Sequence, residues 1–114
     1  FKKKGESNMI KINIAQDFSN TPGGRYKVNG PYSGEEFRDN ILIPNYHKAK
    51  NNKEKLEINF DGCFGYPSSF LDEAFGGLAV AEKSHDVLNI IDLICNDDPK
   101  IIDDIVKSVK EAKI

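Results

Sequence analysis

The order of strand-like and helix-like apolar patterns is the feature that most limits how this chain can fold. Apolar residues alternate with polar ones in Ile10–Ile14 and in Leu56–Phe60, which is the period of a strand with one buried face. Segments with helical apolar spacing, 33–50 and 69–83, come after these strands. Alternation of this kind predicts a mostly parallel sheet with helical crossovers, and hence a small α/β domain.

Three more segments complete the predicted fold. The nearly continuous apolar run 87–95 is typical of the most interior strand, covered on both faces by helices. Asp98 and Pro99 then mark the start of a last helix, as N-cap and first helical residue. After the turn at 21–24, residues 25–28 have room for a short extra strand. We expect roughly four strands, in a mostly parallel or mixed sheet, and about three helices.

Local signals refine the first two helices. Ser33 is an N-cap candidate with Glu36 at capping-box spacing, and Pro44 predicts a kink in the helix that follows. Gly76 and Gly77 lie in the middle of the second helix, where each costs about 1 kcal/mol relative to Ala. Close packing of another backbone on this glycine pair is the expected compensation.

Composition and charge favour a single domain with neither a membrane nor a nucleic acid as partner. The 114 residues suffice for one hydrophobic core, and a net charge of -2 gives no electrostatic reason to bind nucleic acid or anionic membranes. No apolar run approaches the ~20 residues of a membrane span. We expect one cytoplasmic domain over residues 9–114, a monomer or weak dimer, behind a polar, basic lead at 1–8.

The turn between the second main strand and the second helix holds the strongest functional signals. The stretch 61–78, DGCFGYPSSFLDEAFGGL, passes from a strand through a glycine-containing turn into a helix that starts with two serines. Ser68 and Ser69 are of the type that caps helices, since their hydroxyls accept from unpaired backbone N–H groups. A phosphate on Ser68 would instead add roughly -2 charge beside the helix N-terminus, which could expel a docked partner. Asp72 and Glu73 are typical first-turn acids that complement the helix dipole.

Two stretches carry a resemblance to a known family. They are GGRYKVNGPYSGEEFRDNILIP, residues 23–44, and LEINFDGCFGYPSSFLDEAFGGL, residues 56–78. Between Ile10 and Cys95 the chain resembles the STAS-like domains of the DUF4325 type, bacterial and phage-associated relatives of anti-sigma-factor antagonists. The resemblance implies a small STAS-like fold and a regulatory role, and we expect neither enzymatic activity nor a cofactor.

The resemblance also implies a phosphorylation site and a partner. In the antagonists an Asp-Ser-Ser-Gly-like turn opens a helix, and a partner kinase phosphorylates its first serine. Ser68 takes that place here, with Ser69 next to it, while Pro67 and Phe70 stand where the antagonists have Asp and Gly. The implied partner is a kinase of the histidine-kinase-type ATPase fold, which phosphorylation releases.

The first functional hypothesis is therefore a non-enzymatic module that docks on a protein partner through the turn and helix at 65–78. Phosphorylation of Ser68 would switch this docking. The predicted contact residues lie in or next to the turn: Gly65, Tyr66, Pro67, Phe70, Asp72 and Glu73.

The second hypothesis is a small enzyme with a pocket at the carboxyl ends of the strands, where open α/β sheets bind ligands. Cys63 or His85 would supply its reactive group, yet neither belongs to a recognisable catalytic signature. Cys63 and Cys95 read more simply as small core residues, and no His or Cys stands at metal-ligand spacing. The two hypotheses differ in whether Cys63 or His85 is exposed in a cleft.

Overall fold

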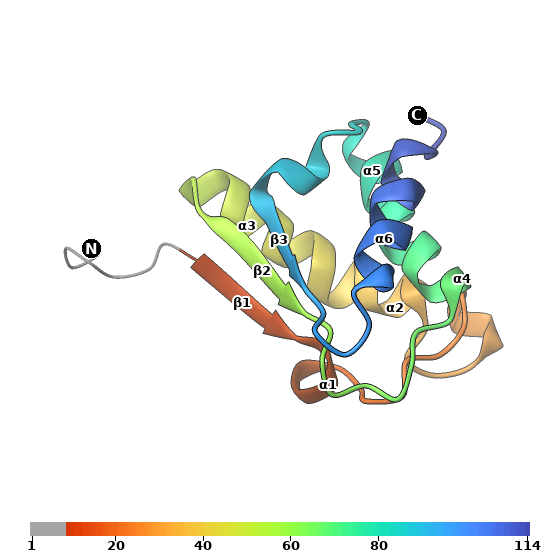
Figure 1. The fold of residues 1–114 in the computed structure, drawn as a ribbon. Coiled ribbons are helices and arrows are strands. Elements are labelled where there is room, and N and C mark those ends of the chain that lie inside the picture. Colours follow the sequence, from red (N-terminus) through yellow and green to blue (C-terminus); the bar gives the residue numbers. More distant parts are fainter. Residues whose placement is uncertain (1–8) are drawn as a thin grey trace.

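A three-stranded parallel sheet organises the protein in the computed structural model, which describes residues 9–114. The strands β1 (Met9–Asn13), β2 (Lys55–Asn59) and β3 (Ile91–Ile94) lie side by side in the order β1-β2-β3 (Figure 1). Both neighbouring pairs are parallel, with helical segments between consecutive strands. The predicted α/β class is confirmed, and the central strand is β2.

Three long helical stretches follow the strands, and two of them contain a π-helical turn. The first consists of α2 (Gly34–Phe37), the π turn η2 (Arg38–Leu42) and α3 (Ile43–Asn52). The second consists of α4 (Ser68–Leu71), the π turn η3 (Asp72–Gly76) and α5 (Gly77–Glu82). The third is α6 (Lys100–Lys110), and the short elements are α1 (Ile14–Asp17) and the 3-10 helices η1 (Lys27–Asn29) and η4 (Val87–Ile90). All three predicted helices are present.

The core lies between the helices and one face of the sheet. Leu56 and Ile58 of β2 are fully buried, as the alternating pattern predicts. Figure 1 shows the helices on one side of the strands. The register row of Lys11, Glu57 and Asp92 lies on the opposite face, and its polar side chains suit contact with water.

Glycines let the helices approach one another closely. A Cβ on Gly34 would lie 2.5 Å from the Phe70 carbonyl oxygen, so α2 meets α4 at a distance that only glycine permits. At Gly76 a Cβ would stand 3.4 Å from the Ser108 carbonyl oxygen of α6, an ordinary contact, so the α6 backbone lies near but does not require a glycine there. At Gly77 the neighbour is the Arg38 side chain instead, 2.7 Å from such a Cβ at Nη1.

The first long helix passes Pro44 without ending. Ile43 donates its backbone N–H to the Arg38 carbonyl, five residues back, in the π turn directly ahead of the proline. Since Pro44 has no N–H of its own, a widened turn at this place accommodates the missing bond. The predicted irregularity is present, and the helix reaches Asn52.

Two strand predictions are wrong. The segment 25–28 is no strand, because the backbone N–H groups of Tyr26 and Lys27 donate to the side chains of Asn29 and Glu35, and η1 forms there instead. In the run 87–95 only Ile91–Ile94 is strand, and it forms an edge of the sheet. The apolar character of the run 87–95 also comes from η4, where Val87 is fully buried.

The two remaining predictions concern the polar lead and membrane-spanning helices. The predicted polar lead, 1–8, lies outside the described residues. Within residues 9–114, no helix is long and apolar enough to cross a membrane.

Candidate functional site

The turn between β2 and α4 is anchored at several points. The Tyr66 hydroxyl donates to the Phe60 carbonyl at 2.8 Å, which fastens the turn to the end of β2. The Phe64 N–H donates to the Asn20 carbonyl at 3.0 Å, so the turn also lies against the loop after α1. Gly62 has a φ of 94°, a conformation that glycine adopts without strain. The turn is thus an ordered structure.

Asp61 ties the same turn to the loop after β3. Its carboxylate accepts from the Asn96 N–H at 2.7 Å, the Asn96 side-chain amide at 2.9 Å and the Asp97 N–H at 2.9 Å. These bonds lower the pKa of Asp61, and the bond from the Asp97 N–H has the largest effect. A carboxylate so engaged connects two loops.

An exposed strip of this turn is the candidate contact surface. Phe64 is 85% exposed, and Gly65, Pro67 and Ser68 are exposed beside it. We call these four residues the turn surface. An exposed aromatic ring on an ordered turn is a typical anchor for a protein partner.

Two of the predicted contact residues support this surface from beneath. Phe70 is fully buried and packs near Phe37, with ring centroids 5.8 Å apart, so the structure does not place it on the contact surface. Tyr66 is half-buried, with its ring 5.3 Å from that of Phe60. Both rings hold the turn in place through the core.

The interpretation of the serines as helix caps is wrong. Pro67 occupies the N-cap position, and no side chain caps α4. Ser68 and Ser69 are therefore the first residues inside the helix, and the Phe70 N–H donates to the Pro67 carbonyl. Ser68 is exposed and Ser69 is half-buried, which leaves Ser68 the more accessible hydroxyl.

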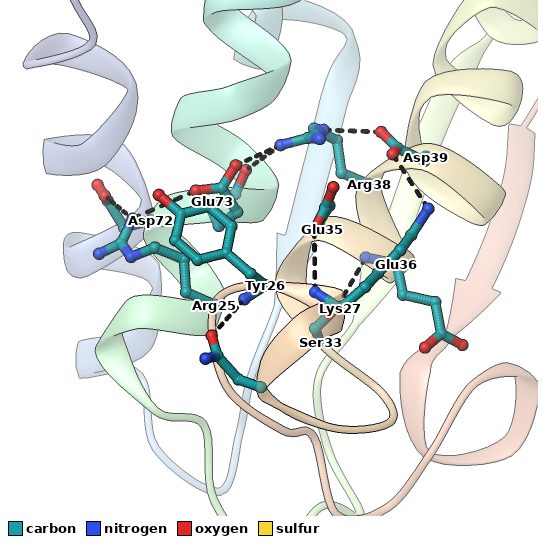
Figure 2. A network of polar contacts seen from close by, with 11 residues as sticks. Arg25, Tyr26, Lys27, Ser33, Glu35, Glu36, Arg38, Asp39, Asp72 and Glu73 are labelled. Atoms are coloured by element: carbon teal, nitrogen blue, oxygen red, sulfur yellow. Dashed lines mark hydrogen bonds and ion pairs between the residues drawn. The ribbon is translucent and has the colours of Figure 1, made fainter.

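Asp72 and Glu73 belong to a chain of ion pairs that joins three segments (Figure 2). Arg25 donates to Asp72 at 2.8 Å and lies 3.4 Å from Glu73. Arg38 donates to Glu73 at 2.5 Å and to Asp39 at 2.9 Å. The chain continues from Asp39 to a lysine of the loop before α2, Lys27, at 3.5 Å.

The exposure of the side chains and their pKa shifts indicate which of these ion pairs stabilise the fold. The side chains of Arg38 and Glu73 are each only 17% exposed, so they neutralise each other where water is scarce. Burial opposes the charge on Arg38, but its bonds to Asp39 and Glu73 raise its pKa. The bond to Asp72 raises the pKa of Arg25. Both predicted contact acids pair with arginines, but the Glu73 side chain is largely buried while that of Asp72 is half exposed.

Cys63 lies at a cavity near the carboxyl ends of β2 and β3. The cavity has a volume of about 350 Å³ and is lined in part by Phe60, Cys63, Tyr66, Cys95 and Asp97. Burial raises the pKa of the Cys63 thiol, and that of Cys95 as well. The Cys63 sulfur contacts the Tyr66 hydroxyl and the Ser19 carbonyl, neither of which is a general base.

The histidines lie elsewhere. His85 Nε2 contacts the Ala112 carbonyl at 2.8 Å, and His47 Nε2 contacts Glu82 at 2.7 Å. The described walls of the Cys63 cavity include no histidine. Across residues 9–114, no group of three or more His, Cys, Asp or Glu side chains could hold a metal ion. Of the two candidate reactive residues, His85 is exposed and does not line this cavity, while Cys63 is half-buried at its wall.

Sequence reasoning missed Phe64, Arg25 and Arg38. Phe64 had a readable signal, since it stands between Gly62 and Gly65 in a turn where an apolar side chain has little core to enter. Arg25 and Arg38 had none, because Asp72 and Glu73, their partners on the second long helix, are 47 and 35 residues away in sequence.

The fold and site together define a small α/β domain, with one helical layer and an exposed turn ahead of its second long helix. Comparison with protein families agrees: the model of the STAS-like domain of unknown function (DUF4325) matches residues 33–101. The chain belongs to this family. Searches of curated proteins and of solved structures found no match.

Proposed function

We propose that this domain is a regulatory protein-interaction module that docks on its partner through the turn surface. The observation that carries the proposal is the exposure of Phe64, at 85%, on a turn anchored from several sides. A ring held on a fixed backbone loses little conformational entropy on binding, which favours its use as an anchor. Ser68 is exposed at the edge of the same surface, so a phosphate there would alter the contact directly.

The proposed partner is a protein of the histidine-kinase-type ATPase class, as the resemblance to anti-sigma-factor antagonists suggests. Such a kinase would transfer the γ-phosphoryl group of ATP to Ser68 Oγ, with ADP as the leaving group and loss of the hydroxyl proton. The new charge of roughly -2 would stand at the edge of the turn surface, where docking would have to remove water from it. Phosphorylation thereby weakens docking.

A role without catalysis agrees with the state of Cys63. Its raised pKa keeps the thiol protonated near neutral pH, and its neighbours cannot deprotonate it. If the protein were an enzyme, the cavity beside Cys63 would be its active site.

The partner ATPase is first found by crosslinking through residue 64 and then purified. Calorimetric titration measures its affinity for the wild-type domain and for each variant. We expect Phe64→Ala to weaken binding at least about tenfold, as for an interface anchor worth more than 1 kcal/mol. Val80→Ala, at another exposed apolar residue, should bind like the wild type. With ATP present, mass spectrometry should find phosphate on Ser68 and none in Ser68→Ala. Equal binding by Phe64→Ala and wild type would reject the turn surface as the docking site.

A further inference from the structure

Ser68 shares a surface hollow with the arginine that holds the loop before α2. The hollow has a volume of about 310 Å³, and its walls include Ser68, Asp72, Arg25 and Lys107. Its other described walls are Leu71, Asp104, Ser108 and Glu111. A phosphate on Ser68 would thus stand at a hollow whose described walls carry two cations and three carboxylates.

Ser68 and Asp72 stand on the same face of the helix, one turn apart. The Asp72 N–H donates to the Ser68 carbonyl, the bond of a regular α-helical turn. Side chains at this spacing are neighbours, with Cβ atoms about 5–6 Å apart. The Arg25 guanidinium, now 2.8 Å from Asp72, is therefore within about one helical turn of any group on Ser68.

Arg25 also belongs to a loop with a conspicuous exposed tip. Its carbonyl accepts from the Glu35 N–H at 3.0 Å, at the first turn of α2. The residues directly after it, 26–29, carry Val28 at 89% exposure and Tyr26 at 47%. We call residues 26–29 the tip. The ion pairs of Arg25 with Asp72 and Glu73 fasten this loop to the second long helix.

We propose that Arg25 is a latch that couples the phosphorylation state of Ser68 to the conformation of the tip. This inference rests on the proposed phosphorylation of Ser68. A phosphate offers roughly twice the charge of Asp72 and accepts two parallel bonds from a guanidinium, so it draws Arg25 away from Asp72. The residues directly after Arg25, the tip, change conformation when its side chain moves. The tip, with the exposed Tyr26 and Val28, then differs in conformation between the two states.

The test needs no partner. Phosphoserine is incorporated at position 68 during translation, and the backbone amides of the uniformly labelled domain are compared by NMR with those of the unmodified domain. We expect shifts at the tip as well as around residues 68–72. In an Arg25→Gln background the tip shifts disappear while those around 68–72 remain. Lys107→Gln, which removes the other cation of the hollow, should leave the tip shifts in place.

A second variant guards against a phosphoserine domain that folds poorly. Asp72→Asn in the unmodified chain removes the 2.8 Å partner of Arg25, and we expect the tip amides to shift in this variant too. Tip amides that stay unchanged with phosphoserine, or shifts that persist in Arg25→Gln, overturn the latch. If partner binding weakens on phosphorylation while the tip stays still, docking through the turn stands and the latch falls. If the tip moves but no partner responds to Ser68, the latch stands and the proposed function falls.

Discussion

Glu73 of the second long helix accepts a 2.5 Å hydrogen bond from Arg38 of the first, and each residue lies in a π-helical turn. Both side chains are 17% exposed, and Arg38 also lies over Gly77, where a side chain would collide with it. The pair joins the two helices, and Glu73 also lies 3.4 Å from Arg25 of the loop before α2. It is a structural element of the site.

Breaking this pair should cost stability. We expect Glu73→Gln to lower the free energy of unfolding by about 2 kcal/mol, because the Arg38 charge loses the less exposed of its two counterions where water is scarce. Lys27→Ala provides the control, since the pair of Lys27 with Asp39 is exposed and should contribute less than about 1 kcal/mol. Urea denaturation of both variants measures the difference, and equal losses would contradict a structural role for Glu73.

The approach of α2 to α4 depends on Gly34. Gly34→Ala should destabilise the domain by about 1–3 kcal/mol, because the new Cβ overlaps the Phe70 carbonyl and forces the helices apart. Gly24→Ala is the matched control, since its Cβ would make an ordinary 3.6 Å contact with Asn29. Thermal melts should show a clear drop in Tm for the first variant and little change for the second.

The two phenylalanines of the turn region should behave in opposite ways. Phe70→Ala removes a fully buried ring and should cost about 3–5 kcal/mol. Phe64→Ala, at an exposed ring, should change stability by less than about 0.5 kcal/mol. Denaturant titration tests both. A large loss in Phe64→Ala would mean that the ring supports the fold, and its use as a docking anchor would need another explanation.

Acid should weaken the loop contact made by Asp61. Its pKa is lower in the folded than in the unfolded chain, so its contribution to stability is complete above the unfolded value of about 3.9. That contribution disappears as the pH falls through the folded pKa. Carbon-detected NMR titration of the side-chain carboxyl should place its midpoint below that of a model peptide. Asp61→Asn should reduce the loss of stability between neutral and acid pH.

The Cys63 thiol should react slowly with alkylating reagents. Because burial raises its pKa, the rate of alkylation by iodoacetamide should reach half its maximum above the ordinary value of about 8.5. Measuring Cys95→Ser isolates Cys63, and the same chain unfolded in urea gives the unperturbed profile. A half-maximal rate below pH 8 would instead favour the enzyme hypothesis.

The sequence predicted the helices better than the strands. Helix periodicity and the Ser33 cap act over a few residues, and the structure has Ser33 accepting from the Glu36 N–H at 3.0 Å. The other half of the capping box differs, because Glu36 accepts from the Tyr32 N–H. The predicted strand at 25–28 does not form, because the side chains of Asn29 and Glu35 accept from the N–H groups of Tyr26 and Lys27, and composition does not reveal such partners.

The alternation of strand and helix patterns by itself determined the α/β class, the three long helices and the position of the turn before Ser68. Those features follow from local periodicity and turn chemistry. Only the tertiary structure decided that β3 is an edge strand, that Phe64 is exposed while Phe70 is buried, and that Arg25 shares a hollow with Ser68. Each of these depends on contacts between segments far apart in the chain, and the closeness of two such segments is a property of packing.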